Sequence, residues 1–260
     1  MYLERCNYLE VEAYLKEHDT IIIPIGSIEN HGKHMPLGTD TFIPNKICSL
    51  IYEQSWCMIA PTINYGATDD LVGFAGTISI GVDGMIDLLT RITDQLYAYG
   101  FRHFVVVNGH GGNTKSIDSV GQKLSRKGAY MAICNWWLMA GQINPEWRGG
   151  HGGKEEANGV LAYDPTLIKK EYLDLDECTR NDLGKELPYG SWSSINYKGV
   201  SVTVPRPIKS ITDNGYLIYG IQQDYPRDCS EEMGKAMVQG VADYISEFID
   251  VFAKTKLPEE

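Results

Sequence analysis

Short apolar runs and amphipathic stretches alternate along most of the chain. Four runs are apolar and uncharged, and each predicts a strand: Thr20–Ile25, Cys57–Pro61, Phe104–Val107 and Tyr130–Cys134. The first of them suits a strand that is buried on both faces of a sheet. Between the runs, apolar residues recur at helical spacing in residues 44–52, in a stretch from the N-cap Asp83 to the C-cap Gly100, and in a stretch from about Thr114 to Gly128.

A longer amphipathic stretch begins near Ser230 and predicts a C-terminal helix. Its apolar residues form one stripe, which we interpret as core packing: Met233, Met237, Val241, Tyr244, Ile245, Phe248 and Phe252. Strands that alternate with helices are joined by right-handed crossovers in a mainly parallel sheet. The pattern therefore predicts an α/β fold in which helices cover both faces of that sheet.

The segment from about Lys185 to Arg227 breaks the alternation. It is rich in Gly, Pro, Tyr and Trp and has no clear period, so we expect loops and a small hairpin over the edge of the sheet. No low-complexity linker divides the chain, and we expect residues 1–260 to form a single domain.

Composition and charge narrow the class of protein. Of the 260 residues, 43% are hydrophobic, which is typical of a globular chain. The net charge of −11 argues against binding to nucleic acid or to an anionic membrane, because both carry negative charge. No apolar stretch is long enough to span a bilayer, and the N-terminus has no signal-peptide pattern. With six scattered cysteines as free thiols, we expect a cytoplasmic protein.

The first of three glycine- and histidine-bearing segments follows the strand Thr20–Ile25. Within twelve residues it holds two acids and two imidazoles, Glu29, His31, His34 and Asp40. These are the oxygen and nitrogen donors that a borderline divalent cation takes, and on extended backbone Glu29 and His31 share a face. We interpret the segment as part of a metal site, with an ion-paired loop as the alternative.

The second segment, Asn108–Asn113, follows the strand Phe104–Val107. Its glycines let the backbone turn sharply, and His110 is its one strong metal-binding side chain. A phosphate-binding turn is the alternative. The segment matches neither the dinucleotide-binding pattern nor the P-loop, which argues against that alternative.

The third segment runs from Gly149 to Asn158. His151 is followed five residues later by Glu156, at the start of a predicted helix. This pair could transfer protons or complete a metal shell. We interpret Glu155 as an acidic first-turn residue that the helix dipole favours.

Further polar and aromatic residues lie near these segments. Asp69 and Asp70 are interpreted as turn residues with a role at the rim of a site, and Trp136 and Trp137 as either pocket wall or core packing. There is no serine-nucleophile elbow and no H-E-x-x-H helix.

Together the three segments resemble the creatininase family of metal-dependent amidohydrolases. The family pattern Gly-(Ser/Ala)-x-Glu-x-His-Gly-x-His-x-Pro-x-x-(Thr/Val)-Asp is met by residues 26–40, and the turn Asn-Gly-His-Gly-Gly-Asn by residues 108–113. The pattern His-(Ala/Gly)-Gly-x-x-Glu-(Thr/Ser)-Ser is partly met from His151 to Glu156. A Phe-Pro-Gly-Thr-x-Ser element has its counterpart in residues 74–79. The similarity covers about residues 20–165, with its motifs in the right order.

The resemblance implies a three-layer α/β/α fold and a site for two divalent metal ions, Zn, Mn or Fe. By it, Glu29 and His110 would hold one ion, His31 would hold the other, and Asp40 would bridge them. Glu156 matches an acidic active-site residue of the family.

The resemblance also implies a position near the substrate for His151, and a homo-oligomeric assembly. His151 matches a histidine near the substrate. Family members form homo-oligomers, often hexamers, and we expect the aromatic-rich segment Pro188–Tyr225 to form the contact.

The chain departs from the family pattern in its pocket. Creatinine hydrolases carry a further metal-binding glutamate two residues after the turn histidine, where this chain has Gly112. Ala75 replaces a proline, Asp69-Asp70-Leu71 stands where many members have a histidine, and Ala157-Asn158 replaces a pair of small hydroxyl residues. We therefore do not expect creatinine to be the substrate.

These observations predict a metal-dependent hydrolase in which a metal-bridging hydroxide attacks a carbonyl group of a small polar, cyclic substrate. His151 and Glu156 would move protons to the leaving group. A cyclic amide or formamide is the first expectation. One alternative is hydrolytic C–C ring opening of a cyclic diketone, such as a dehydro-inosose. The alternative of another class is a non-catalytic, metal-binding pseudo-enzyme.

Overall fold

The computed structural model describes residues 1–173, 181–216 and 224–258, and its centre is a parallel sheet. The helices are α1 (Tyr8–Tyr14), α2 (Thr39–Gln54), α3 (Gly81–Tyr99), α4 (Thr114–Ser125), α5 (Trp136–Ile143), α6 (Lys154–Tyr163) and α7 (Glu231–Phe252). The strands are β1 (Thr20–Ile25), β2 (Met58–Ile59), β3 (His103–Asn108), β4 (Tyr130–Asn135), β5 (Ser194–Tyr197) and β6 (Val200–Thr203).

The central sheet has the strand order β2-β1-β3-β4, and all neighbouring strands are parallel. Every residue of β1 and β3 is buried, as expected for β-branched strands in the middle of a covered sheet. In the register of the sheet, Ile25 pairs with Asn108 and Asn108 with Asn135, so these three strands end at the same level. The loops after β1 and β3 therefore begin side by side.

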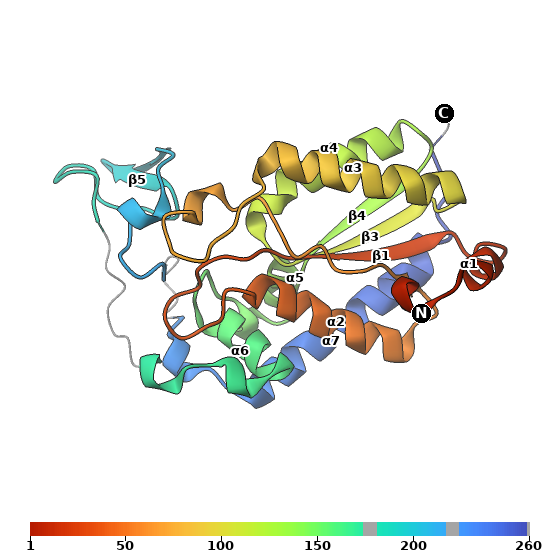
Figure 1. Cartoon of the computed structure of the whole chain (residues 1–260). Coiled ribbons are helices and arrows are strands. Elements are labelled where there is room, and N and C mark those ends of the chain that lie inside the picture. Colours follow the sequence, from red (N-terminus) through yellow and green to blue (C-terminus); the bar gives the residue numbers. More distant parts are fainter. Residues whose placement is uncertain (174–180, 217–223, 259–260) are drawn as a thin grey trace.

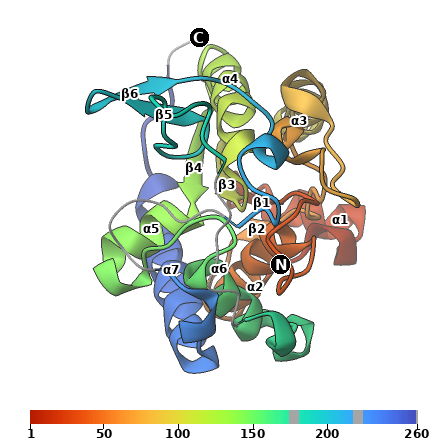
Figure 2. The same ribbon diagram turned by 90° about the vertical axis from the view of Figure 1, so that its left-hand side faces the viewer.

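Helices cover both faces of the sheet (Figure 1). Side chains of β1 at odd positions, such as Ile21 and Ile23, pack with residues of α3 and α4. The even position Ile22 packs with residues of α2, α5, α6 and α7 on the other face. Figure 2 shows the resulting layers, with α3 and α4 above the sheet and α2, α6 and α7 below it. The predicted α/β/α architecture with a mainly parallel sheet is confirmed.

Several predicted element boundaries are wrong. The second strand is limited to Met58–Ile59, and α3 begins at Gly81, so Asp83 lies in its first turn and is not its N-cap. Gly100 does end α3, with φ 121°, a conformation that favours glycine. The helix expected over 44–52 begins five residues earlier, at Thr39, with Pro44 inside it. This change has a consequence for the site, because it brings Asp40 onto a helix.

The predicted C-terminal helix is confirmed, with Ser230 as its N-cap, but its buried stripe differs from the predicted one. Met237, Val241 and Ile245 are buried as expected, whereas Tyr244 is 55% exposed. The stripe is completed by the buried residues Gly234, Val238, Ala242 and Ile249. Helical geometry explains the error, because the residue directly before a buried position points about 100° away from it.

The segment after residue 185 forms the expected hairpin, an antiparallel pair of β5 and β6. It lies with the loops at the carboxyl ends of the strands (Figure 1), and its exposed apolar residues include Val200 and Val202. Residues 217–223 of the expected contact surface lie outside the described ranges, and oligomerisation stays a prediction.

Two further expectations concern the described ranges. The five cysteines there are free, and Cys178 lies outside them. No helix in these ranges is long and apolar enough to cross a membrane.

Replacing Ile245 tests the core between α7 and the sheet. Ile245 is fully buried, so Ile245→Ala should leave a cavity and lower the free energy of unfolding by about 2–5 kcal/mol. Tyr244→Ala, next to it but largely exposed, should change that energy by about 0.5 kcal/mol or less. Urea unfolding followed by circular dichroism measures both; equal losses would show that the described packing of α7 is wrong.

Candidate metal centre

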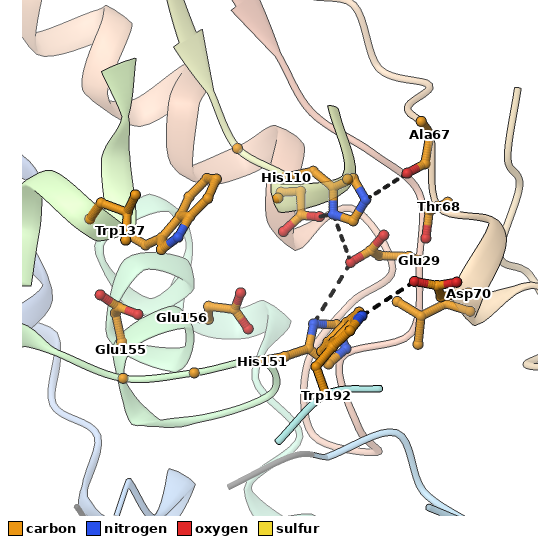
Figure 3. A pocket seen from close by; sticks show the side chains of 18 residues that line it. Glu29, Ala67, Thr68, Asp70, His110, Trp137, His151, Glu155, Glu156 and Trp192 are labelled. Carbon is orange, nitrogen blue, oxygen red and sulfur yellow. Dashed lines mark hydrogen bonds and ion pairs between the residues drawn. The ribbon is translucent and has the colours of Figure 1, made fainter. Parts of the chain in front are cut away.

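The three histidine-bearing segments meet at the carboxyl ends of β1 and β3. The loop after β1 carries Glu29 and His31, and the turn after β3 carries His110. Asp40 lies in the first turn of α2, and Glu156 in the first turn of α6. This is the edge of an open parallel sheet where ligands generally bind. Figure 3 shows Glu29, His110, His151 and Glu156 around a common space.

The Asp40 carboxylate lies between two imidazole rings. Its Oδ1 is 3.0 Å from His31 Nε2, and its Oδ2 is 3.2 Å from His110 Nδ1. The hydroxyl of Ser27 also donates a hydrogen bond of 2.7 Å to Oδ2. Burial opposes the charged form, but His31 and His110 outweigh it and hold the pKa of Asp40 well below its usual value. Each oxygen of this carboxylate therefore belongs to a different group of polar side chains.

The packing of α2 against the strand ends positions Asp40. Pro44 has no N–H to donate to the Asp40 carbonyl, so this turn of the helix lacks one backbone hydrogen bond. The turn packs closely on Gly109, where a Cβ atom would lie 1.9 Å from the Asp40 carbonyl oxygen. Only glycine fits there, and its absence of a side chain lets α2 approach β3 directly.

Backbone carbonyl groups orient all three clustered histidines. His31 Nδ1 is 3.1 Å from the carbonyl oxygen of Glu29, and His110 Nε2 is 3.0 Å from that of Ala67. His151 Nε2 is 2.7 Å from the carbonyl oxygen of Asn30. Because a carbonyl oxygen only accepts, each of these nitrogens carries the hydrogen and donates it. The opposite nitrogen of each ring points into the cluster, as in histidine ligands of metal ions.

The charge of the neighbouring carboxylates sets the protonation of the histidines. Burial disfavours the charged ring of His31, but Asp40 and Glu156 outweigh it and raise its pKa well above the usual value. Glu29 and Asp40 raise the pKa of His110 in the same way. Both rings thus respond to an excess of negative charge, which a divalent cation would also balance.

His151 behaves differently from the other two rings. Burial, together with the charge of His31, lowers its pKa to about 4, so its ring is neutral at neutral pH. Its Nδ1 carries a lone pair and faces Glu29 Oε1 at 3.7 Å. His151 Nδ1 and Glu29 Oε1 are both acceptors, so a proton or a cation could bind between them.

Glu29 and Glu156 complete the ring of acidic groups. Glu29 Oε1 is 3.1 Å from His110 Nδ1, while its buried Oε2 has no hydrogen-bond partner among the described residues. Glu156 Oε2 accepts a hydrogen bond of 2.7 Å from the amide of Gly152, and its Oε1 is 3.6 Å from His31 Nε2. The buried orphan oxygen of Glu29 points to a positively charged ligand that completes the site.

The donor atoms form sets that could hold metal ions. One set is Glu29, Asp40 and His110, and another is His31, Asp40 and Glu156; within each, one donor atom per residue lies within 4.8 Å of the others. A third set of this kind is Glu29, His31 and His151. Mixed carboxylate and imidazole donors suit Zn, Mn and Fe.

A cavity of about 520 Å³ opens over these groups. Trp137 of α5 lines one side of it, and Asp70 and Trp192 line another (Figure 3). Trp192 Nε1 donates a hydrogen bond of 3.3 Å to Asp70, and its ring is nearly perpendicular to that of His151, 5.5 Å away between centroids. The cavity has room for a small molecule in contact with the polar cluster.

The other residues singled out in the sequence are divided between the cavity and its surroundings. His34 belongs to none of the three donor sets, and burial lowers its pKa to about 4. Trp136 is buried in the core, whereas its neighbour Trp137 lines the cavity. Asp70 lines the cavity as well, while Asp69 accepts a hydrogen bond from Ser79.

The surroundings of Glu155 differ from those of an ordinary first-turn acid. Glu155 does lie in the first turn of α6, but only 3% of its surface is exposed, and it lines the cavity. Burial, with the charges of Glu156 and Asp224 nearby, raises its pKa well above the usual value. Sequence reasoning missed this position because an acid at a helix start is normally solvated.

Sequence reasoning also missed the groups that hold the loops. The Asn113 side chain accepts a hydrogen bond from the amide of Ala67 and donates one to the carbonyl of Gly26. Asp224 accepts hydrogen bonds from the amides of Gly150 and Lys154. In the sequence, the one sign of these contacts was an asparagine, Asn113, at the end of the glycine-rich turn.

Comparisons with known proteins identify the family. The family profile Creatininase, described as creatinine amidohydrolase, matches residues 4–249. The mycofactocin precursor peptide peptidase of Mycobacterium tuberculosis is 32% identical over 163 residues, which cover 58% of this chain and 61% of that protein. The 3-dehydro-scyllo-inosose hydrolase of Thermotoga maritima is 33% identical over 183 residues, which cover 66% of this chain and 59% of that protein. The chain thus spans about three fifths of the length of these curated relatives.

A solved structure named "Creatininase Mn" has the same fold. It superposes with a TM-score of 0.73 at 21% identity, covering 98% of this chain and 99% of the other. The fold, the cluster at the strand ends and the family profile agree, and the protein belongs to the creatininase family.

Proposed function

We propose that the protein is a hydrolase whose active centre holds two divalent metal ions. The observation that carries this proposal is the position of Asp40, whose two oxygens face two different imidazoles. A carboxylate shared in this way is the arrangement that a bridging ligand needs in a two-metal site. The relatives support the proposal, because those with curated names are hydrolases.

We assign the ligands from the donor sets. Glu29, Asp40 and His110 would hold one ion, and His31, Asp40 and Glu156 the other. Ions bound there would lower the pKa of a water ligand to about 7 and polarise the carbonyl group of the substrate. Zn, Mn and Fe fit these donors, and a zinc form and a manganese form among the structural neighbours support Zn and Mn.

The geometry favours a ligand role for Glu156 and a proton-transfer role for His151. Glu156 Oε2 is tied to the Gly152 amide, so Oε1 is fixed toward His31 and is not free to follow a leaving group. The neutral ring of His151 presents an unprotonated Nδ1 to the cavity. Such a nitrogen can take a proton from the attacking water and pass it to the leaving group.

The proposed substrate is a small polar carbonyl compound. The cavity of about 520 Å³ suits such a molecule, and cyclic amides or formamides stay our first expectation. The Thermotoga relative supports the alternative, hydrolytic C–C cleavage of a cyclic ketone. Both reactions begin with attack of water on a carbonyl carbon and differ in the leaving group. We also propose a cytoplasmic location, because the scattered cysteines suit a reducing compartment, and a homo-oligomer, because the family resemblance implies one.

The departure at Gly112 bears on the pseudo-enzyme alternative. A Cβ atom there would lie 2.1 Å from the Ala67 carbonyl oxygen and 2.4 Å from His110 Nε2. Gly112 therefore lets the Ala67 carbonyl reach and orient the His110 ring. This is a reason for glycine that is compatible with an intact metal site, so the missing glutamate does not by itself indicate lost activity.

Removing the shared carboxylate should remove both ions. Asp40→Ala should fall from about two bound ions per chain to well below one, because each ion loses a charged ligand. Mass spectrometry of the metal content after dialysis against Zn or Mn measures this. Asp83→Ala, in the first turn of α3, serves as the control and should keep its metal. Stoichiometric metal in Asp40→Ala would contradict the bridging assignment.

His151 and Glu156 should separate metal binding from proton transfer. His151→Ala should keep both ions and lose turnover by on the order of a hundredfold or more, the usual value of a positioned acid–base group. Glu156→Ala should lose one ion. The measurements are metal content, and turnover of metal-loaded protein on a panel of cyclic amides, formamides and cyclic diketones. Wild-type turnover in His151→Ala would rule out its role, and full metal loading without any wild-type turnover would favour a pseudo-enzyme.

Substitution of Gly112 should damage the site without supplying a ligand. In Gly112→Ala the new methyl group must displace Ala67 or the His110 ring, so we expect at least about tenfold weaker metal binding. Gly111→Ala is the matched control, since its Cβ would meet only Trp137, at an ordinary 3.8 Å. Titration with Zn against a competing chelator measures both. Equal affinities for the two variants would show that the close approach at Gly112 is unimportant.

A further inference from the structure

Two acidic side chains line the cavity without belonging to any of the donor sets. Asp70 lies in the short helical turn Asp69–Leu71, and Glu155 in the first turn of α6. Figure 3 shows these two side chains on different walls of the cavity. Neither is among the residues that are proposed to hold the ions.

Glu155 offers an acceptor that the protein leaves unpaired. Its side chain is 97% buried, and its Oε1 has no hydrogen-bond partner among the described residues. Figure 3 shows its carboxyl group beside Glu156 and directed toward Trp137, on the wall of the cavity. A buried acceptor without a partner is unfavourable, so a ligand that donates a hydrogen bond to it binds more tightly.

Asp70 offers a second acceptor at the mouth of the cavity. It is exposed, and one of its oxygens accepts the hydrogen bond from Trp192 that was described above. An exposed acid of this kind acts on bound molecules mainly through its charge and its acceptor oxygens.

No lysine or arginine lines the cavity in the described part of the chain. Arg148 lines an adjoining pocket, where its Nε donates a hydrogen bond to the Gly141 carbonyl. Among the described lining residues, an anionic substituent at this wall would meet the carboxyl groups of Asp70 and Glu155 and neither lysine nor arginine.

We propose that Asp70 and Glu155 make the cavity selective for uncharged or cationic substrates that carry a hydroxyl or amino group beside the reacting carbonyl, and that the cavity rejects anionic substrates. This inference rests on the proposed function, because the metal centre fixes where the carbonyl lies. It narrows the substrate class to donor-bearing compounds, such as polyols or amino compounds, and excludes phosphorylated or carboxylated ones. The physical basis is the unpaired, buried oxygen of Glu155, which can accept the hydrogen bond of the donor, and the carboxylate of Asp70 at the mouth, which repels an anion.

Hydroxamates test the inference, because they anchor on a metal ion and can carry different tails. We would measure dissociation constants of four hydroxamates of similar length for the metal-loaded protein by calorimetry. Their tails are a propyl group, a hydroxyethyl group, an aminoethyl group and a carboxyethyl group. For the wild type we expect the hydroxyl and amino tails to bind about tenfold more tightly than the propyl tail, with the carboxylate tail weakest.

Variants assign the selectivity to the two acids. In Asp70→Asn/Glu155→Leu the four affinities should agree within about threefold, while metal content and binding of the propyl hydroxamate stay as in the wild type. Glu155→Gln keeps the shape and an acceptor oxygen, so it should retain the preference for the hydroxyl tail. Asp69→Asn removes the same charge next to the cavity but not in its lining, and should leave all four affinities unchanged.

The outcomes separate the two proposals. Equal binding of the carboxylate and amino tails by the wild type would overturn the inference, as would full selectivity in the double variant, even if metal content and hydroxamate binding are normal. Failure of every hydroxamate to bind a protein that also holds no metal would overturn the proposed metal centre, and the inference with it.

Discussion

The shared carboxylate of Asp40 is the interaction on which the rest of the site depends. Its two oxygens bring the loop after β1 and the turn after β3 to one point, because one faces His31 and the other His110. Asp40 can do this because α2 begins directly at the strand ends and packs on Gly109 without an intervening side chain. The buried negative charge is stabilised by the rings around it, and their raised pKa values record the same attraction from the other side.

A second level of organisation aims the histidines. The carbonyl oxygens of Glu29, Asn30 and Ala67 each accept a hydrogen bond from one ring nitrogen. This fixes the tautomer of each ring and the direction of its other nitrogen. These carbonyl groups lie in irregular loops, where they are not occupied by the backbone hydrogen bonds of a helix or a sheet. The irregular backbone around the site therefore has a function of its own, and Asn113 holds part of it in place by bonding to two neighbouring loops.

The cavity above the cluster combines two chemically different ends. At its floor, acids and imidazoles converge in sets that could hold cations. Its walls carry Trp137, Asp70 and Glu155, with no lysine or arginine among the described residues. The candidate donor residues of the floor lie in the motifs that resemble the family, within the range that the family profile matches. Glu155 and Asp70 lie at positions where the chain departs from the family pattern or where the pattern is silent. Within one fold, chemistry and selectivity can thus change separately.

The sequence by itself determined the strands β1, β3 and β4, the α/β alternation and the donor-bearing segments, because strand burial and local motif spacing are properties of neighbouring residues. It also indicated that the segments would converge, since parallel strands end at one edge. It did not determine that Asp40 lies on a helix, that Tyr244 faces outward, that His34 stays outside the donor sets or that Glu155 is buried. Each of these depends on which surface a segment meets after folding. Burial and the distance between side chains remote in sequence arise only when α2, α6 and the loops pack together, so the tertiary structure alone decided them.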